Sequence, residues 1–403
     1  LNHPISGCSD AEAVVCHVRD MDGRLISKGI CTNQSYSLCC YSCYCDVNNM
    51  HPWNPDDPYL YTIEIQAGED KVTGYFAMRT FTIEPDKKGL PRFCLNHEPL
   101  FLNGVLDQGY WPDGLYTAPS DEALIYDIQT MKNLGFNMIR KHLKIEDPLQ
   151  YYWCDKLGFF VWQDMPHATA MNATDTSNAE AAGRAIYENA LRADLNRDYN
   201  HPSIIMEVLF NETWGINHTA GKAADGMTTH EWMTYLYNLC KQINPNLLVE
   251  DMSACNQDHI QPTDVNTFHM YPGTYSGVKS TVNSFATQAG PGSQKNFYSG
   301  YKNEGEPFLN SEYGGVGAFA GDKDVSLCFK YQTDVQRQYE NLNGYVYTEP
   351  YDIEYERNGI LTYDRRNKLF PYGEIAWGGD MSIADLNQAN YVGVDGQPVR
   401  EVT

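Results

Sequence analysis

The feature that most constrains the fold is a change of pattern near residue 92, after which short apolar runs alternate with helical stretches. Such alternation is typical of a parallel sheet covered by helices. The expected strands are Leu100–Leu106, Phe136–Arg140, Phe159–Gln163, Ile204–Phe210, Leu247–Glu250, Val265–His269, Pro307–Asn310 and Tyr345–Tyr347. The expected helices are Ser120–Leu134, Pro148–Leu157, Ala179–Tyr199, Thr229–Ile243 and Val325–Leu342.

This count of strands, spread over about 270 residues, predicts the α/β class and a (β/α)₈ TIM barrel. A doubly wound open sheet is the alternative, but no glycine-rich dinucleotide fingerprint follows the first strand. The helix after the sixth strand is poorly marked in the sequence.

The first 84 residues predict antiparallel β-structure instead. Val14–Arg19 and Arg24–Ile30 alternate in hydropathy around a turn, and further β-runs cover Tyr59–Gln66 and Gly74–Glu84. We interpret Pro85–Pro91 as a polar linker. The predicted organisation is a partial sandwich domain over 1–84, a barrel domain over 85–385, and the start of a truncated C-terminal β domain or tail over 386–403.

Cysteines are concentrated near the start of the chain. Of the twelve, seven fall in the first 45 residues, namely Cys8, Cys16, Cys31, Cys39, Cys40, Cys43 and Cys45. The group lacks a second paired set at zinc-ligand spacing. Disulfides or plain buried thiols are therefore favoured here over a structural metal, and no metal ligands are assigned.

Charge and hydropathy exclude two classes of partner. The 29 basic and 52 acidic side chains give a net charge of −23, without a basic patch, so we expect no nucleic acid as partner. No apolar run reaches the ~20 residues of a membrane span. We expect a soluble protein and leave its compartment open, with secretion or the periplasm as candidates.

In a barrel, functional side chains gather where the strands end. The polar residues at the predicted ends include the carboxylates Asp107, Asp164, Glu212 and Glu312. The other polar residues at these ends are Arg140, His142, Gln163, Asn211, His269, Tyr271 and a further carboxylate, Glu349. A ring of carboxylates, amides and histidines suits binding of a polyol and cleavage of an acetal.

Glu212 and Glu312 follow the apolar runs of the predicted fourth and seventh strands. Two carboxylates about 5 Å apart would serve a retaining glycosidase, one as nucleophile and one as acid/base. The acid needs a pKa raised by burial or by the other carboxylate. The alternative is that each glutamate is a helix cap or a surface charge.

Several motifs, taken in order, give the chain a family resemblance. They are His51–Tyr61, Phe136–His142 (Phe-Asn-Met-Ile-Arg-Lys-His), Cys154–Asp164, Arg197–Ile205 leading to Asn211-Glu212, Ser311–Gly314 (Ser-Glu-Tyr-Gly) and Gly359–Arg365. With them the chain resembles glycoside hydrolase family 2, which contains β-galactosidases, β-glucuronidases and β-mannosidases. The resemblance implies an immunoglobulin-like domain before the barrel. It also implies an N-terminal sugar-binding domain, which we expect to be missing from these residues.

The resemblance also implies residue roles. Glu212 would be the acid/base and Glu312 the nucleophile. Asn211 would bind the sugar 2-hydroxyl, Tyr271 and Arg140 would contact the nucleophile, and His142 would contact the sugar. The further candidates for substrate binding, each with simple packing as its alternative, are His269, Asp107, Trp162 and Asp164.

The sequence thus predicts a retaining exo-β-glycosidase acting on a carbohydrate with a terminal β-linked sugar, and β-galactoside is favoured. Arg357-Asn-Gly359 lacks the lysine of the Asn-x-Lys motif that marks β-glucuronidases, and Val161–Asp164 leans toward β-mannosidases. A non-catalytic carbohydrate-binding barrel is the alternative from another class. The resemblance implies Mg²⁺ or Na⁺ without an identifiable ligand set, and a homo-oligomer is left open.

Overall fold

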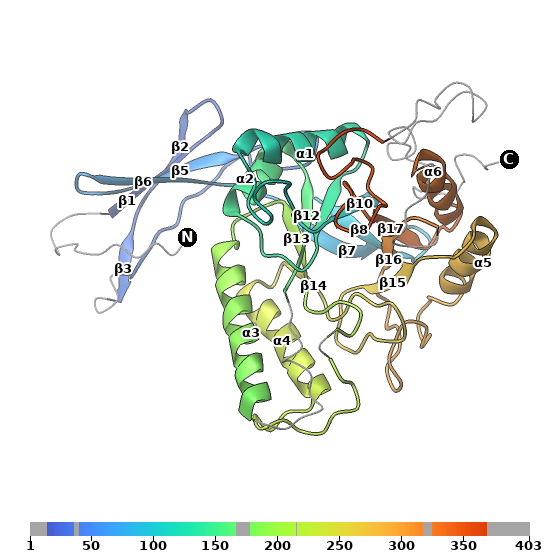
Figure 1. Ribbon diagram of the computed structural model, residues 1–403. Helices are drawn as coiled ribbons and strands as arrows, with labels where there is room; N and C mark the ends of the chain where they lie inside the picture. Colours follow the sequence, from blue (N-terminus) through green and yellow to red (C-terminus); the bar gives the residue numbers. More distant parts are fainter. Residues whose placement is uncertain (1–13, 36–39, 167–177, 215, 317–324, 369–403) are drawn as a thin grey trace.

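The computed structural model describes residues 14–35, 40–166, 178–214, 216–316 and 325–368 (Figure 1). The segment 386–403, predicted as a C-terminal domain or tail, lies outside these residues, and so do Cys8 and Cys39.

The centre of the molecule is one sheet of eight parallel strands curled as a barrel (Figure 1), which confirms the predicted fold class. Its members are β10 (Leu102–Asp107), β11 (Met138–Lys141), β12 (Phe160–Asp164), β13 (Ile204–Val208), β14 (Leu248–Glu250), β15 (Asn266–Met270), β16 (Phe308–Tyr313) and β17 (Leu342–Tyr347). Hydrogen bonds join them in the order β14-β13-β12-β11-β10-β17-β16-β15. The first barrel strand along the chain, β10, pairs with both the second, β11, and the last, β17. The sheet therefore closes between the strands that come first and last in the chain.

Helices follow most of these strands. They are α1 (Asp121–Asn133), α2 (Pro148–Leu157), α3 (Asn178–Arg197), α4 (Thr229–Ile243), α5 (Tyr275–Ala286) and α6 (Val325–Gln336). Their starts follow capping rules: Asp147 caps α2 ahead of Pro148, and Thr228 forms a capping box with Glu231 at α4.

Two helices differ from the prediction. Helix α5 was not expected because serine, threonine and glycine fill much of its sequence, yet Thr274 caps it and it buries Val278 and Val282. Helix α6 ends at Gln336 rather than Leu342, since Leu342 already belongs to β17. Both α5 and α6 pack against side chains of the barrel strands.

The N-terminal region contains antiparallel sheets, as predicted. One has the order β2 (Leu25–Ile30), β1 (Val14–Arg19), β5 (Tyr61–Ala67) and β6 (Asp70–Phe76), and it extends away from the barrel (Figure 1). A short pair joins β3 (Thr32–Ser35) to β4 (Cys40–Ser42).

The prediction for the junction with the barrel was wrong in one respect. The run Gly74–Glu84 is divided between β6 and β7 (Phe81–Pro85), and β7 pairs with β8 (Pro91–Leu95), which pairs with β9 (Glu98–Leu100). Pro85–Pro91 is therefore the turn of a hairpin, not a linker. The domain limits themselves stay a prediction.

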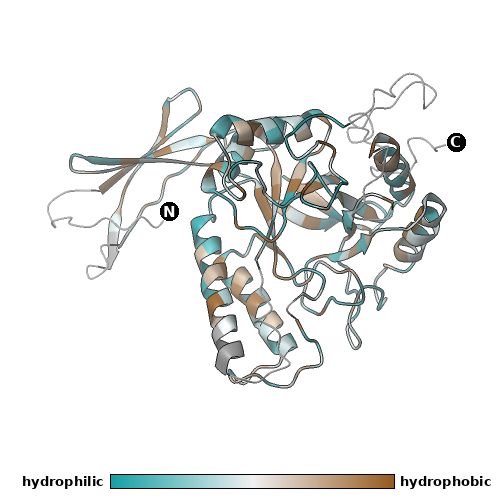
Figure 2. Cartoon of the chain, in the orientation of Figure 1, coloured by the Kyte–Doolittle hydropathy of each residue, from teal (hydrophilic) through white to brown (hydrophobic). Residues whose placement is uncertain are grey.

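This small sheet closes the amino-terminal end of the barrel. Phe81 and Phe93, with Trp53, belong to the same apolar cluster as inward-facing barrel residues such as Met138 and Leu309. Figure 2 shows the hydrophobic residues concentrated in the strands at the centre. The interior is a packed core, as barrel interiors are.

The period of two along a strand then explains where the polar residues lie. Arg140 comes two residues after buried Met138, Asp164 two after Trp162, and Ser311 two after Leu309. Each polar side chain therefore faces the same interior one layer nearer the carboxyl end. At that end, polar and charged side chains replace the apolar side chains that fill the rest of the barrel interior.

The N-terminal sheets are held to the barrel by polar contacts. Trp53 Nε1 donates to the carbonyl of Asp155 at 2.8 Å, and the Tyr75 hydroxyl donates to Asp155 Oδ2 at 2.8 Å. The Arg79 guanidinium donates to the carbonyls of Pro202 and Ile204. Among the described helices, none is both long and apolar enough to cross a bilayer.

Candidate active site

The predicted catalytic residues meet at the carboxyl end of the barrel. Glu312 lies on β16, Glu212 follows β13, and the closest oxygens of the two carboxylates lie within 4.8 Å of each other. Glu312 is buried, and Glu212 is mostly buried. Carboxyl groups of retaining glycosidases stand about 5 Å apart, so this spacing suits a direct attack by one of them.

Arg140 is the central cation of the site. It is fully buried, and Nη1 donates to Glu312 Oε1 at 3.1 Å. Nη2 donates to Asn211 Oδ1 at 2.9 Å and to Asp164 Oδ2 at 2.8 Å. Burial raises the pKa of Asp164, but the charges of Arg140 and His142 outweigh that effect and lower it. One guanidinium thus positions Glu312, the amide of Asn211 and the carboxylate of Asp164.

His269, on β15, bridges the two glutamates. Its Nδ1 lies 2.5 Å from Glu212 Oε1 and 3.4 Å from Glu312 Oε2. Its Nε2 lies 2.9 Å from Ser253 Oγ, and that hydroxyl donates to Ser311 Oγ. These contacts fix the orientation of the His269 ring between the serine hydroxyls and the two glutamates.

The protonation of Glu212 differs from the sequence expectation. Burial alone would raise its pKa, but the hydrogen bond and charge of His269 lower it to about 2. Trp214 Nε1 donates to its other oxygen at 3.3 Å. Glu212 is consequently held as an anion at neutral pH.

Glu212 also carries backbone strain. Its φ is +51°, and that of Thr213 is +62°, in the left-handed region that costs a non-glycine residue about 1–2 kcal/mol. A hydrogen bond from its backbone amide to the Ser253 carbonyl fixes this turn. The turn aims the carboxylate over the barrel instead of along the strand.

Tyr271 follows β15 and completes the contacts of Glu312. Its hydroxyl donates to Glu312 Oε2 at 3.0 Å and lies 3.0 Å from Thr348 Oγ1. Burial, followed by the charge of Glu312, raises the pKa of Tyr271 well above its usual value, so it stays a neutral donor. The structure thereby brings Tyr271, Arg140, His269 and Asn211 to the glutamate pair.

Other predicted residues lie at the margin. Asp107 pairs with the buried Lys141 at 2.6 Å and accepts from Tyr351, so its oxygens are engaged in a separate cluster. Trp162 is fully buried beneath Arg140, with 5.8 Å from the guanidinium to the ring. His142 donates from Nδ1 to Asp164 at 2.8 Å and is partly exposed.

Sequence reasoning missed several supporting groups. Ser253, Ser311 and Thr348 orient His269 and Tyr271, and Glu356 lies near enough to Glu312 and His142 to interact with their charges. Glu356 accepts from Gln108 at 3.1 Å. Of these residues, only Ser311 could have been suspected from the sequence, because it directly precedes Glu312.

The family resemblance implies Mg²⁺ or Na⁺ without a ligand set, and the glutamate pair does not fit such an ion. Glu212, His269 and Glu312 are close enough to share an ion. However, hard cations prefer oxygen ligands, whereas this group includes a ring nitrogen that is hydrogen-bonded to Glu212. We derive no step through a metal.

Comparisons with known proteins identify the family of the barrel. Residues 88–349 match the family described as glycosyl hydrolases family 2, TIM barrel domain. A β-glucuronidase of Bacteroides fragilis is 27% identical over 245 residues, which are 58% of this chain and 32% of the relative. A β-galactosidase of Lactococcus lactis is 28% identical over 191 residues, 45% of this chain and 18% of the relative.

Among solved structures, a Bifidobacterium dentium β-glucuronidase complexed with coumarin-3-O-glucuronide superposes with a TM-score of 0.71. It is 18% identical, and the match covers 96% of this chain and 62% of that structure. This likeness supports the fold. The chain spans about a third or less of the two curated relatives described above.

Proposed function

Because this chain belongs to glycosyl hydrolase family 2, we propose that it is a retaining exo-β-glycosidase with Glu312 as nucleophile and Glu212 as acid/base. The observation that supports the proposal most is the separation of the two carboxylates, within 4.8 Å. An inverting enzyme needs a wider gap to hold a water between them.

In the first step Glu312 would attack the anomeric carbon of the sugar, and the bond to the leaving oxygen would break. Arg140 and Tyr271 donate hydrogen bonds to the Glu312 carboxylate and fix its direction. Asn211, fixed by Arg140, would offer its amide N–H to the sugar 2-hydroxyl. Such contacts contribute most when they strengthen in the transition state.

The leaving oxygen needs a proton, which the His269–Glu212 pair can supply. Nδ1 of His269 lies 2.5 Å from Glu212 Oε1. A proton passed across this contact would make Glu212 the neutral acid. After departure of the alcohol, the Glu212 anion takes a proton from water, and the resulting hydroxide breaks the bond between sugar and Glu312.

Trp214 suits the leaving-group side of this site. Its indole is 63% exposed, and Nε1 contacts Glu212 at 3.3 Å. An exposed indole next to the acid/base offers a flat face to an aglycone or a second sugar. We assign it to leaving-group binding.

For the sugar itself we favour a neutral glycone, with β-galactoside first and β-mannoside as an alternative. Glu356 lies near Glu312, and Glu349, which is buried, accepts from the same Gln108 side chain. Burial raises the pKa of Glu349 well above its ordinary value, so we assign the repulsion of a uronic acid carboxylate to Glu356.

A β-glucuronide is the second candidate. It is favoured by the B. fragilis and B. dentium relatives, which are named β-glucuronidases, and by exposed Arg357 beside Glu356, which could pair with a uronate.

Two measurements test the function. With an aryl β-glycoside substrate, ¹H NMR at early times should show the β-anomer of the released sugar first. Release of the α-anomer would contradict the retaining mechanism. A panel of p-nitrophenyl β-galactoside, β-mannoside and β-glucuronide should give the highest kcat/KM with a neutral sugar, and preference for the glucuronide would overturn the assignment of glycone.

A further inference from the structure

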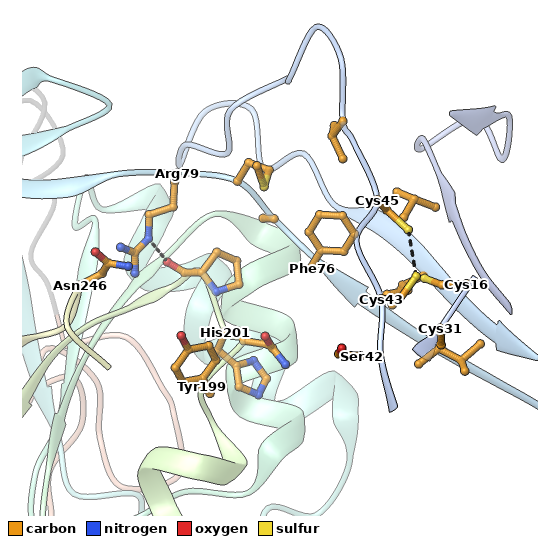
Figure 3. Close-up of a pocket in the computed structure, with 18 of the residues that line it drawn as sticks. Cys16, Cys31, Ser42, Cys43, Cys45, Phe76, Arg79, Tyr199, His201 and Asn246 are labelled. Carbon is orange, nitrogen blue, oxygen red and sulfur yellow. Dashed lines mark hydrogen bonds between the residues drawn. The ribbon is translucent and has the colours of Figure 1, made fainter. Parts of the chain in front are cut away.

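Four cysteine side chains gather on one face of the N-terminal sheet, remote from the catalytic pair. Cys16 lies on β1, Cys31 directly follows β2, and Cys43 and Cys45 follow β4. They line a cleft whose opposite wall is formed by Arg79, Tyr199, His201 and Asn246 at the amino-terminal end of the barrel (Figure 3). The catalytic glutamates lie at the other end of the barrel.

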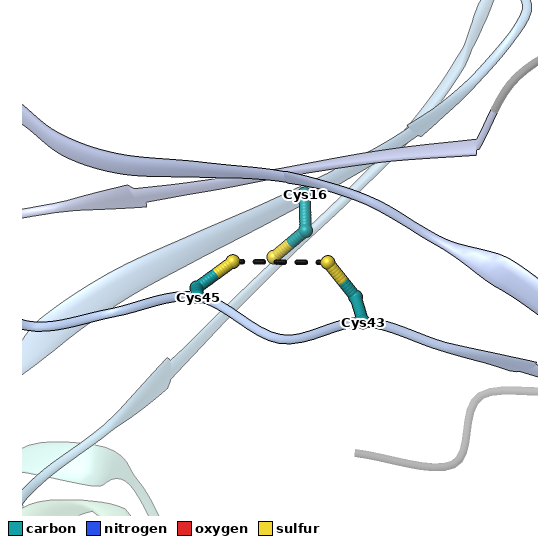
Figure 4. Close-up of side chains that lie close together, drawn as sticks. All are labelled: Cys16, Cys43 and Cys45. Atoms are coloured by element: carbon teal, nitrogen blue, oxygen red, sulfur yellow. Dashed lines mark hydrogen bonds between the residues drawn. The ribbon is translucent and has the colours of Figure 1, made fainter.

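Three of the four sulfurs are close enough to share one metal ion. The Sγ atoms of Cys43 and Cys45 are 3.7 Å apart, and those of Cys16, Cys43 and Cys45 all lie within 4.8 Å of one another (Figure 4). Zinc bound to sulfur at about 2.3 Å sets neighbouring sulfurs about 3.8 Å apart. A disulfide would need about 2.05 Å.

Cys31 is the fourth thiol of the cluster, beside the three that lie within 4.8 Å of one another. Its thiol is hydrogen-bonded to that of Cys43, while Cys16 is hydrogen-bonded to Cys45. The backbone amide of Cys31 donates to the Val14 carbonyl at 2.8 Å, which anchors the residue to β1. The cluster thus draws ligands from three separate stretches of chain.

A glycine makes room for the sulfurs. Gly29 pairs with Cys16 in the register of β1 and β2. A Cβ atom at Gly29 would stand 2.4 Å from Cys43 Sγ and 3.0 Å from Cys45 Sγ, well inside contact distance. The sheet therefore leaves a cradle that any other residue would fill.

We propose that Cys16, Cys31, Cys43 and Cys45 bind one structural Zn²⁺ that ties the segment around β3 and β4 to the four-stranded sheet. Thiolates are the ligands that select zinc, and four of them close the coordination shell, which is the structural type of site. The apolar cluster here has only three buried members among the described residues, so a metal supplies stability that packing lacks.

Zinc binding requires the thiols to release their protons. Burial, together with the neighbouring thiols, raises the pKa of Cys16 to about 12, so the metal-free thiols are neutral. Zinc displaces these protons as each sulfur coordinates, and its affinity falls as the pH is lowered. No oxidant or reductant takes part.

The test is the metal content of the full chain, purified with reducing agent and without chelator. We expect about one zinc per chain. Replacement by Co²⁺ should give intense sulfur-to-cobalt charge-transfer bands and tetrahedral visible bands. Cys43→Ser and Cys45→Ser should lose the zinc, whereas Cys255→Ser, outside the cluster, should keep it. Gly29→Ala retains all four ligands yet should weaken zinc binding at least about tenfold by displacing Cys43.

Wild-type protein without zinc and without cobalt bands would overturn the proposal. So would a disulfide among the four cysteines, found by peptide mapping after thiol blocking of the native protein. Both outcomes are measured on the wild-type chain, so the proposal stays falsifiable even if a cysteine variant fails to fold.

Discussion

Nδ1 of His269 lies 2.5 Å from Glu212 and 3.4 Å from Glu312, so a single imidazole ring bridges the two proposed catalytic carboxylates. This contact lowers the pKa of Glu212. The proposed acid/base is therefore a carboxylate next to a histidine instead of an isolated buried carboxylic acid.

The pair predicts a pH dependence of stability. Because the pKa of Glu212 is lowered to about 2, the contact stabilises the fold above the ordinary glutamate pKa of about 4.3. That contribution is lost as pH falls from about 5 toward 2. Urea unfolding of wild type and His269→Gln should therefore show a difference in unfolding free energy that shrinks over this range. A difference that is constant with pH would contradict the ion pair.

Removing the acid/base should separate the two chemical steps. Glu212→Ala should retain glycosylation by substrates with good leaving groups, while release of the sugar slows by about 10²–10⁴-fold. Added azide should restore turnover and give the β-glycosyl azide, because a small anion fits the space vacated by the carboxylate. Formation of no such azide would argue against the role of Glu212.

Arg140 should matter for stability as well as for catalysis. Arg140→Ala leaves Asp164 and Glu312 buried without their cation, which costs about 3–5 kcal/mol of unfolding free energy. Denaturant unfolding measures this cost. Arg192→Ala, an exposed arginine on α3, is the matched control and should cost under about 1 kcal/mol. Equal costs would refute the central position of Arg140.

Asp107 should behave as a structural residue. Asp107→Asn weakens the buried pair with Lys141 and should destabilise the fold by about 3 kcal/mol, while KM changes little. A large rise in KM at unchanged stability would instead place Asp107 in the sugar site.

Glu356 should tune the choice of sugar. Glu356→Gln removes a negative charge near Glu312, so the kcat/KM ratio of β-galactoside to β-glucuronide should fall several-fold, about the effect of one charge interaction. The same substrate panel measures this, with the exposed Glu98→Gln as control. An unchanged ratio would show that Glu356 does not face the sugar.

The sequence was sufficient to predict the barrel strands and the position of the two glutamates at strand ends, because both follow from local patterns of residues. Apolar runs with period two, followed by polar residues, are visible along the chain, and they correctly indicated β11 to β13 and β16. Helix α5 was missed because its capping by Thr274 and burial of Val278 depend on tertiary packing, which outweighs weak helix propensity.

The remainder of the site depends on contacts between distant residues. Nothing near His269 in sequence shows that it reaches Glu212, 57 positions away, nor that Ser253 orders its protons. The lowered pKa of Glu212 follows from those contacts, so the expected raised value was wrong for the structure without substrate. Likewise, Asp107 lies at the end of its strand, where a substrate-binding residue is expected, but its carboxylate is paired with Lys141.

The central claim is that Glu312 forms a covalent bond with the sugar. The most direct measurement is the intact mass of the chain after incubation with 2-deoxy-2-fluoro-β-glycosides bearing activated leaving groups, followed by peptide mapping. We predict one fluorosugar per chain, attached to the peptide that contains Glu312, and its absence in Glu312→Gln. An adduct on another residue, or turnover of substrate by Glu312→Gln at the wild-type rate, would contradict the account.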